Sequence, residues 1–255
     1  MIEYLKSTDS TNNRLKARLA NSEQPSDGYC LYTFYQTAGR GQSGNGWESE
    51  NGKNLLFSIL FYPNKIQANE QFRLSMFVAV VITNIVRRYI SNNVRIKWPN
   101  DIYVADKKIC GILIETQLLG SNIGWCVAGV GLNVNQTDFS LNIPNPVSIK
   151  VMTGIDTDLH LLIKEIVEEF KQQEHLLYEP NSLKEQYMNL LYRREGYYPY
   201  IEREVSLEPT MNAYKGDGEV FFARIIDIDD EGRIILERKD GRINTYHFKQ
   251  IRYVI

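Results

Sequence analysis

The feature that most constrains the fold is a glycine-rich loop between two apolar segments that favour β-structure. Gly39, Gly41, Gly44 and Gly46 fall within eight residues, "GRGQSGNG", although the whole chain has 17 glycines in 255 residues. The segments before and after the loop, "YCLYTFYQ" and "LLFSILFY", are rich in aromatic and aliphatic residues and predict strands. The sequence therefore predicts a strand–loop–strand unit, and its loop requires unusual backbone geometry or the close approach of another group.

This order of elements excludes the best-known phosphate-binding loops. The stretch from Gly39 to Gly44 formally satisfies Gly-x-Gly-x-x-Gly, but the Rossmann use of that pattern requires a helix to begin in the loop. No Gly-Lys-Ser/Thr closes the loop as in a Walker A motif, and no kinase His-Arg-Asp or Asp-Phe-Gly follows it. Two interpretations stay open: a solvated surface hairpin, or a loop whose amides and Arg40 cradle an anion.

Composition narrows the class of protein further. Lys and Arg number 29 against 31 Asp and Glu, a net charge of −2, which argues against a nucleic-acid binder that relies on charge. No apolar run reaches the roughly 18 residues of a membrane-spanning helix, and "MIEYLKSTDS" lacks the features of a signal peptide. Cys30, Cys110 and Cys126 lie in apolar runs without a Cys-x-x-Cys pair, so we expect reduced core residues and a cytoplasmic protein without membrane contact.

Histidine is scarce, which limits the chemistry of any active site. His160, His175 and His247 are far apart and form no metal-ligand spacing. An enzyme built from this chain must work largely without histidine acid–base chemistry. Phosphoryl or nucleotidyl transfer satisfies this condition, because positioning and charge stabilisation supply most of the catalysis.

The remaining patterns predict an α+β chain: a mixed α/β region followed by a β-rich tail. The segment "DSTN" offers helix N-caps before Leu15 and Leu19, and further helices are expected at residues 70–92, 158–178 and 182–192. Strands are expected at residues 2–6, 29–36, 55–62, 94–98, 102–105, 109–119 and 125–134, with "GSNIG" as the turn between the last two. In the tail they are expected at residues 198–207, 219–228, 233–239, 242–248 and 251–255.

The turn signals "KGDG", "DDEG" and "DG" separate the short strands of the tail and are typical of hairpins. Closely spaced strands over about sixty residues predict a small barrel or sandwich. We therefore place a domain boundary near residue 194, with domains at residues 1–194 and 195–255.

A second polar cluster lies where the predicted strands around "KWPND" end. Pro99 restricts the residue before it, Asn100 and Asp101 present acceptors, and Lys108 follows seven residues later at the start of "ICG". A Lys and an Asp on neighbouring strand ends can face one pocket, although a solvated hairpin tip explains the same residues. "GVGLN" is a third strand end with Gly and Asn, and a Gly in a strand often marks the close approach of a ligand.

Together these segments resemble the biotin–protein ligases (biotin–[acetyl-CoA-carboxylase] ligases). The matching pieces are, in order, "DSTN", "QTAGRGQSGNGW", "KWPND", "KKICGILIE" and "GVGLN", over about the first 135 residues. The resemblance implies a mixed β-sheet catalytic domain with flanking helices, like the class II synthetases, and a small C-terminal SH3-like β-barrel. It also implies a two-step reaction. Biotin and ATP give biotinyl-5′-AMP and pyrophosphate, and a lysine of a biotin carboxyl carrier protein then takes the biotinyl group.

The resemblance also assigns roles to individual residues. Arg40, Lys108 and Asp101 would be catalytic, with Asp101 and Asn100 near Mg²⁺ and the phosphates, and Asp101 as candidate base for the carrier lysine. Biotin would contact Ser10, Thr11, Asn12, Gln36, Arg40, Gly41, Gln42, Lys108, Gly111 and Gly129. The nucleotide would contact Trp47, Asn100, Gly131 and Asn133. The first step brings two anions together, so the cations and Mg²⁺ would neutralise the developing charge.

Two departures from the family pattern have consequences. The family often carries Arg at the position of Gln42 and basic residues at those of Ser43 and Asn45, so the adenylate would be held mainly through backbone amides. Only nine residues precede Ser10, too few for the DNA-binding winged helix of the bifunctional members. We therefore expect a ligase that does not bind nucleic acid.

Other functions remain to be tested. A lipoate–protein ligase or octanoyltransferase shares the fold and a similar carrier, but the Gly-Arg-Gly loop and the "KWPND" segment with Lys108 favour biotin. A non-catalytic biotin- or nucleotide-binding module would not need Arg40, Lys108 and Asp101 together. Family members often form dimers, so a homodimer is one expected state, although no residue selects an interface.

Overall fold

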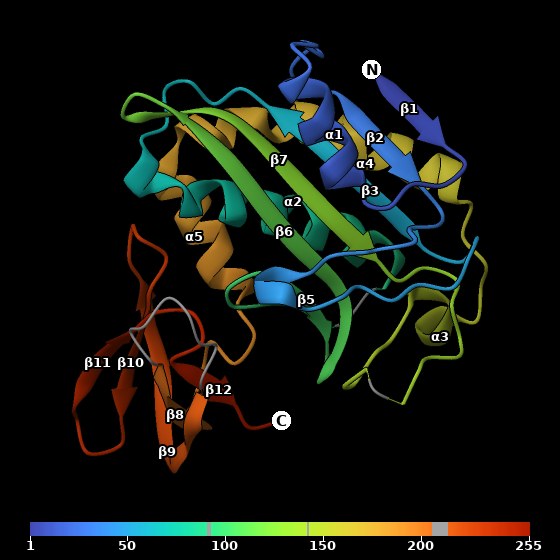
Figure 1. Cartoon of the computed structure of the whole chain (residues 1–255). Coiled ribbons are helices and arrows are strands. Elements are labelled where there is room, and N and C mark those ends of the chain that lie inside the picture. The colour runs from blue at the N-terminus through green and yellow to red at the C-terminus, as the bar shows by residue number, and fades with distance from the viewer. Residues whose placement is uncertain (91–92, 142, 206–213) are drawn as a thin grey trace.

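The computed structural model contains two β-sheets, one in each part of the chain (Figure 1). It describes residues 1–90, 93–141, 143–205 and 214–255. The first sheet has seven strands in the order β1-β2-β3-β7-β6-β5-β4, in which only the β1–β2 pair is parallel. Its strands are β1 (Ile2–Leu5), β2 (Cys30–Thr33), β3 (Leu55–Phe61), β4 (Val94–Lys97), β5 (Asp101–Val104), β6 (Lys107–Leu119) and β7 (Asn122–Leu132).

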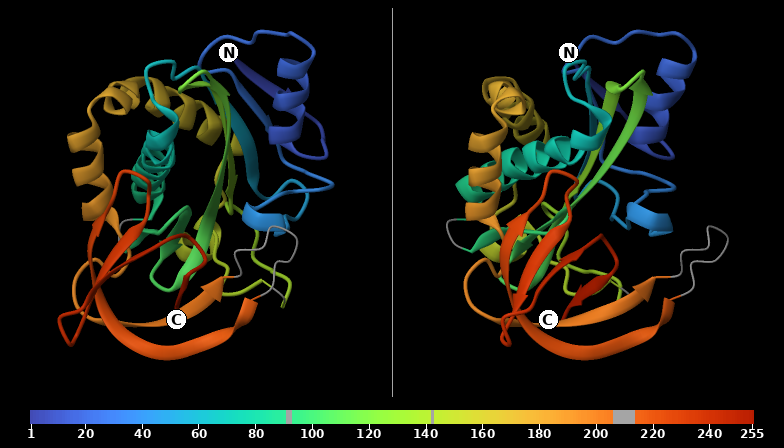
Figure 2. Two further views of the ribbon diagram at one scale, coloured as in Figure 1. Left: turned by 60° about the vertical axis from the view of Figure 1, so that its left-hand side comes forward. Right: turned by 90° about the vertical axis from the view of Figure 1, so that its left-hand side faces the viewer.

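Alternation along the central strands gives this sheet two different faces. In β3, Phe57 and Ile59 belong to the main apolar core, whereas Ser58 and Leu60 point to the opposite side. Helices α2 (Phe72–Tyr89), α4 (Leu159–Gln173) and α5 (Pro180–Leu190) cover the first face, and α1 (Thr11–Ala20) covers part of the second (Figures 1 and 2). The uncovered part of the second face is therefore available to a ligand.

The predicted helices are present with different ends, and the helix expected over residues 182–192 is α5, which begins and ends two residues earlier. The expected helix over residues 70–92 is α2, preceded by a 3₁₀ turn (Ala68–Glu70), and residues 91–92 lie outside the described part of the chain. The expected helix over residues 158–178 divides into α4 and a 3₁₀ helix (Glu174–Tyr178). The short helix α3 (Ile149–Thr153), capped by Ser148, was not predicted.

The C-terminal sheet is antiparallel, with the strand order β11-β10-β9-β8-β12. Its strands are β8 (Tyr198–Val205), β9 (Tyr214–Ile228), β10 (Ile234–Arg238), β11 (Ile243–Tyr246) and β12 (Ile251–Tyr253). The small β-rich tail and the mixed α+β class are confirmed. Gly232 and Gly241 have φ of +82° and +85° in the predicted turns "DDEG" and "DG".

Two predicted turns differ from the structure. "KGDG" lies inside β9 and is not a turn: Gly218 faces β8, where a Cβ would lie 2.7 Å from the Glu202 carbonyl oxygen, so glycine permits a close strand approach. The end of the expected strand over residues 198–207 lies outside the described residues. Within "GSNIG" only Gly120 and Ser121 form the turn, because β6 and β7 extend further than the pattern predicted.

Trp98 connects the two sheets. Its indole Nε1 donates to the Gly232 carbonyl at 2.8 Å, and its ring packs at an edge against Phe248. Arg193 donates to the Val254 carbonyl at 2.9 Å. The C-terminal sheet thus lies next to the β4–β5 end of the larger sheet (Figure 2).

Two further findings concern membrane-spanning helices and the three cysteines. In the described ranges, no helix has both the length and the apolar character needed to cross a membrane. Cys30, Cys110 and Cys126 are buried and free, as predicted. Burial raises the pKa of each of the three thiols well above its ordinary value.

Candidate active site

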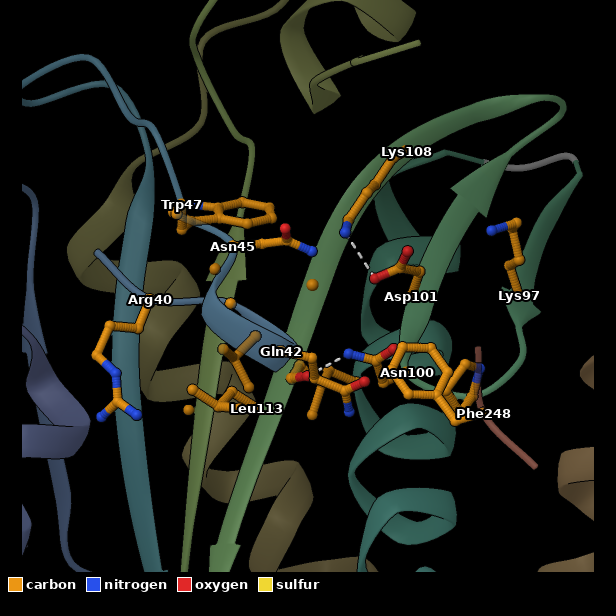
Figure 3. A pocket seen from close by; sticks show the side chains of 18 of the residues that line it. Arg40, Gln42, Asn45, Trp47, Lys97, Asn100, Asp101, Lys108, Leu113 and Phe248 are labelled. Atoms are coloured by element: carbon orange, nitrogen blue, oxygen red, sulfur yellow. Dashed lines mark hydrogen bonds and ion pairs between the residues drawn. The ribbon is translucent and has the colours of Figure 1, made fainter. Parts of the chain in front are cut away.

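A cavity of about 320 Å³ lies on the uncovered face of the larger sheet (Figure 3). Its walls come from the start of α1, the glycine loop, the β4–β5–β6 strand ends, β7 and the C-terminal sheet. The predicted residues that line it are Ser10, Thr11, Asn12, Gln36, Arg40, Gly41, Gln42, Trp47, Asn100, Asp101, Lys108, Gly111, Gly129 and Gly131. Residues from five separate segments of the sequence therefore meet in one cavity.

One end of the cavity is built from neutral hydrogen-bonding groups. Gln36 Oε1 accepts from the Thr11 amide at 2.7 Å and from its hydroxyl at 3.1 Å. Ser58 lies between Thr11 and Asn12, with its hydroxyl 2.7 Å from Thr11 Oγ1 and 2.5 Å from Asn12 Oδ1. Ser10 is the N-cap of α1, but its side chain makes no capping hydrogen bond. Its hydroxyl is therefore available to a ligand in the cavity.

Three glycines make room on the sheet for the side chains above it. A Cβ on Gly129 would lie 2.2 Å from Asn12 Oδ1, and one on Gly131 would lie 2.4 Å from Trp47 Cε2. Gly111 pairs with Gly131 across β6 and β7, and its Cβ would lie 2.8 Å from the same indole. Every other residue type would push Asn12 or Trp47 off the sheet.

Lys108 and Asp101 face each other across the β5–β6 hairpin, as the sequence predicted (Figure 3). Lys108 Nζ lies 2.6 Å from Asp101 Oδ1, and both side chains are largely buried, with exposed fractions of 28% and 18%. The Lys108 ammonium also lies 5.6 Å from the centre of the Trp47 ring. The Lys108 ammonium can also attract a ligand anion, and that anion would compete with the Asp101 carboxylate for the ammonium.

Arg40 lines the cavity but points away from the Lys108–Asp101 pair (Figure 3). Its guanidinium donates to Asn13 Oδ1 at 2.6 Å and to Glu115 Oε1 at 3.3 Å. Its backbone forms an isolated antiparallel bridge with Gly46, which closes the glycine loop as a short hairpin. The predicted cation is therefore beside the cavity with its charge directed at Glu115.

The glycine loop also places Gln42 and Trp47 in the cavity wall. Trp47 donates its amide to the Gly39 carbonyl at 2.9 Å, where a Cβ on Gly39 would lie 2.3 Å from the Trp47 carbonyl oxygen. Gln42 Oε1 and Trp47 Nε1 are buried and have no hydrogen-bond partner. Both residues line the cavity.

The two asparagines predicted to contact the nucleotide, Asn100 and Asn133, have different surroundings in the structure. Asn100 lines the cavity, and its side-chain amide donates to the Ile112 carbonyl at 2.6 Å, which leaves Oδ1 as an acceptor. Asn133 does not line the cavity: it is 5% exposed and donates its side-chain amide to the Val147 carbonyl at 3.1 Å. Its observed contacts anchor the segment around Val147.

Sequence reasoning missed several cavity residues. It also missed Ser58 and Glu115, which contact Thr11, Asn12 and Arg40 from behind the cavity lining; each is a polar residue within an otherwise apolar strand, and that interruption was the available signal. Lys97 also lines the cavity, between the rings of Tyr103 and Tyr253 at 5.0 and 4.9 Å, and burial lowers the pKa of its ammonium. The C-terminal sheet contributes Arg203, Phe248, Lys249, Ile251, Arg252 and Tyr253. No local pattern in the tail indicated these contacts.

A resident metal centre is not visible in the side-chain arrangement. Throughout the ranges described above, no group of three or more His, Cys, Asp or Glu side chains could hold a metal ion. The single carboxylate of Asp101 suits Mg²⁺ that enters together with a nucleotide, since such ions are held by one or two carboxylates and the phosphates.

The fold and the cavity together define a class of protein. Residues 4–133 match the model of the biotin/lipoate A/B protein ligase family, and this stretch holds all the predicted site residues. The chain belongs to this family.

Individual relatives agree with this assignment. The chain is 30% identical over 244 residues to the bifunctional ligase/repressor BirA of Escherichia coli, covering 93% of this chain and 69% of that protein. It is 31% identical over 138 residues to a biotin–[acetyl-CoA-carboxylase] ligase of Mycobacterium tuberculosis, covering 53% of this chain and 50% of that one. A biotin protein ligase from Aquifex aeolicus, solved in complex with biotin and ATP, has the same fold, with a TM-score of 0.77 over 99% of both chains at 20% identity.

Proposed function

We propose that the protein is a biotin–protein ligase that uses ATP to attach biotin to a lysine of a biotin carboxyl carrier protein. The observation that carries this proposal is the polarity of the cavity. One end has neutral donors and acceptors around Thr11 and Gln36, and the other end has Lys108 beside Asp101. Biotin has the matching distribution, with a ureido group at one end and a carboxylate at the other.

The ureido group needs both donors and acceptors from the protein. It has one carbonyl acceptor and two N–H donors, which hydroxyl and amide side chains can satisfy together. Ser10, Thr11, Asn12 and Gln36 supply such groups within one corner of the cavity. The apolar tail of an octanoate offers these buried groups no hydrogen bonds, so the cavity disfavours it.

In the first step a carboxylate oxygen of biotin attacks the α-phosphorus of ATP, and the bond to the bridging oxygen breaks so that pyrophosphate leaves. No general base is needed, because the carboxylate is already ionised. Lys108 would bridge the carboxylate and the α-phosphate, Arg40 would neutralise the other side, and Asp101 with Asn100 would hold the Mg²⁺ of the Mg–ATP substrate. These residues stabilise charge and position the two anions.

The second step forms an amide and releases AMP. The attacking lysine amine must lose a proton, because at its usual pKa of about 10.4 little of it is neutral near pH 7. Asp101 is our candidate acceptor for that proton, since its carboxylate lies in the cavity wall. Trp47 and Gly131 would contact the nucleotide, and Gly111 and Gly129 would lie under the biotin.

Four wider assignments belong to the same proposal. We place the catalytic domain at residues 1–194 and the SH3-like domain at residues 195–255, and we expect a cytoplasmic enzyme. The net charge of −2 supports the absence of a nucleic-acid partner. A homodimer stays a prediction that size-exclusion chromatography with light scattering can test.

The decisive test is pyrophosphate release from ATP and Mg²⁺ without a carrier, with biotin, lipoate or octanoate offered separately. Release with biotin alone is expected and would establish the adenylation step. Release with lipoate alone would reassign the substrate within the family, and no release with any acid would refute the catalytic proposal.

A further inference from the structure

Glu115 is an acidic side chain that the proposed reaction does not use, yet it contacts two residues that line the cavity, Asn12 and Arg40. Its Oε1 lies 2.5 Å from Lys16 Nζ and 3.3 Å from Arg40 Nη2, and its Oε2 accepts from Asn12 Nδ2 at 2.8 Å. One carboxylate thus joins a proposed biotin ligand, a proposed catalytic cation and a lysine of α1.

The strand places this carboxylate at the margin of the cavity. Leu113 and Glu115 follow Gly111 at every second position of β6, so all three lie on the same face as the cavity. The Glu115 side chain is 20% exposed. Burial alone would raise the pKa of Glu115. Hydrogen bonds from Lys16 and Asn12 and the positive charges of Lys16 and Arg40 lower the pKa by more than burial raises it, so the pKa lies below its ordinary value.

Arg40 can direct its guanidinium at only one anion site at a time. In this structure it is held by Glu115 and Asn13 and points away from Lys108 (Figure 3). Its side chain is 42% exposed and comes from the glycine loop, so it is able to turn. The carboxylate of the acid substrate must therefore take Arg40 away from Glu115.

We propose that Glu115 is a positioning residue that holds Arg40 outside the anion site until the substrate carboxylate displaces it. Lys16 makes the exchange feasible, because it continues to neutralise Glu115 after Arg40 has left. Asn12 keeps its hydrogen bond to Glu115 throughout, so the ureido end of the cavity is not disturbed. This inference rests on the proposed function, since it takes biotin as the acid.

The exchange sets the apparent affinity for the acid. Only the protein molecules in which Arg40 can reach the substrate carboxylate bind the acid at full affinity. When these molecules are a fraction of the total, the observed dissociation constant rises by the inverse of that fraction. The Arg40–Glu115 pair is partly exposed, so its removal should change affinity by about threefold to fivefold. Removal of Lys16 should have the opposite sign, because Glu115 would then depend more on Arg40.

The experiment measures dissociation constants by calorimetry for biotin and for its uncharged alcohol, biotinol, in the full-length protein. For Glu115→Gln we expect a Kd for biotin about threefold to fivefold lower, because glutamine still accepts from Asn12 but does not attract Arg40. For Lys16→Met we expect a Kd for biotin higher by a similar factor. Biotinol has no carboxylate to draw Arg40, so its Kd should be unchanged in both variants.

Two further variants complete the design. Asn13→Ala removes one hydrogen bond of Arg40 and leaves Glu115 unchanged, so it should lower the Kd for biotin and leave the Kd for biotinol unchanged. Asp156→Asn breaks the Lys150–Asp156 pair, which lies outside the cavity, and should change neither constant. The inference is overturned if Glu115→Gln and Lys16→Met shift biotin affinity in the same direction, or if biotin and biotinol shift equally. Failure of the unmodified protein to bind either compound would instead refute the proposed function.

Discussion

Replacing Gly129 or Gly131 of β7 with alanine should affect the KM of one substrate and not the other. Gly129 lies under Asn12 and Gly131 lies under the Trp47 indole, two residues further along the same face of the strand. Gly129→Ala should therefore raise the KM for biotin, and Gly131→Ala should raise the KM for ATP.

The magnitudes follow from what each new methyl group would meet. Asn12 is fixed by Ser58 and Glu115, so a Cβ placed 2.2 Å from its Oδ1 forces it from its hydrogen bonds. Overpacking of this kind costs about 1–3 kcal/mol, which corresponds to about fivefold to 150-fold in KM. Trp47 belongs to a loop and can lift off the sheet, so Gly131→Ala should affect ATP with little loss of stability.

Thermal unfolding distinguishes the two variants independently of the kinetics. Each kcal/mol lost by Gly129→Ala should lower Tm by about 2–4 °C in a chain of this size. Gly124→Ala in the same strand is the control, because Gly124 does not line the cavity and its Cβ would meet the Leu119 Cβ at 3.1 Å, a milder contact than at Gly129. Kinetics are read from pyrophosphate release, with biotin and Mg–ATP varied in turn. Equal changes in both KM values for both variants would refute this division of the cavity.

Two other substitutions and one labelling experiment have clear expected outcomes. Lys108→Ala should lower kcat for adenylation by about 10²–10³-fold, because it removes one preorganised group that stabilises charge in the transition state. If the unmodified protein and the variant both bind biotin without any turnover, the protein is a binding module and the proposal is wrong. Gln42→Arg should slow adenylate release in a filter assay, and an unchanged off-rate would contradict our reading of this position. Burial raises the pKa of Cys30, Cys110 and Cys126, so a thiol reagent at pH 8 should label them only after denaturation. Labelling of the folded protein would contradict their burial.

Local patterns predicted the part of the site that one hairpin builds. Asp101 and Lys108 are separated by a short turn, so strand pairing alone brings them together. The glycine loop was likewise predictable, because it lies between two apolar strands that follow each other in the sequence. The role of "KGDG" was mistaken because a glycine that permits a close strand approach looks the same in sequence as a turn glycine.

Contacts between distant segments required the structure. Glu115 meets Lys16 and Arg40 only because α1 packs across β3 and β7 and the glycine loop folds over the same face. Phe248 reaches the cavity only because Trp98 fixes the position of the C-terminal sheet. Neither arrangement has a period or a spacing that a sequence pattern can express.

The register of the larger sheet also explains why Lys108 and Arg40 are each paired with a carboxylate when no substrate is bound. Asp101, Gly111 and Gly131 are paired across β5, β6 and β7, so the two glycines that seat the Trp47 indole lie directly beside a carboxylate. Two positions along β6 from Leu113, Glu115 supplies a second carboxylate at the other margin. Lys108 is thereby neutralised by Asp101 and Arg40 by Glu115, at 2.6 and 3.3 Å. Binding of two anionic substrates would therefore compete with these two existing ion pairs.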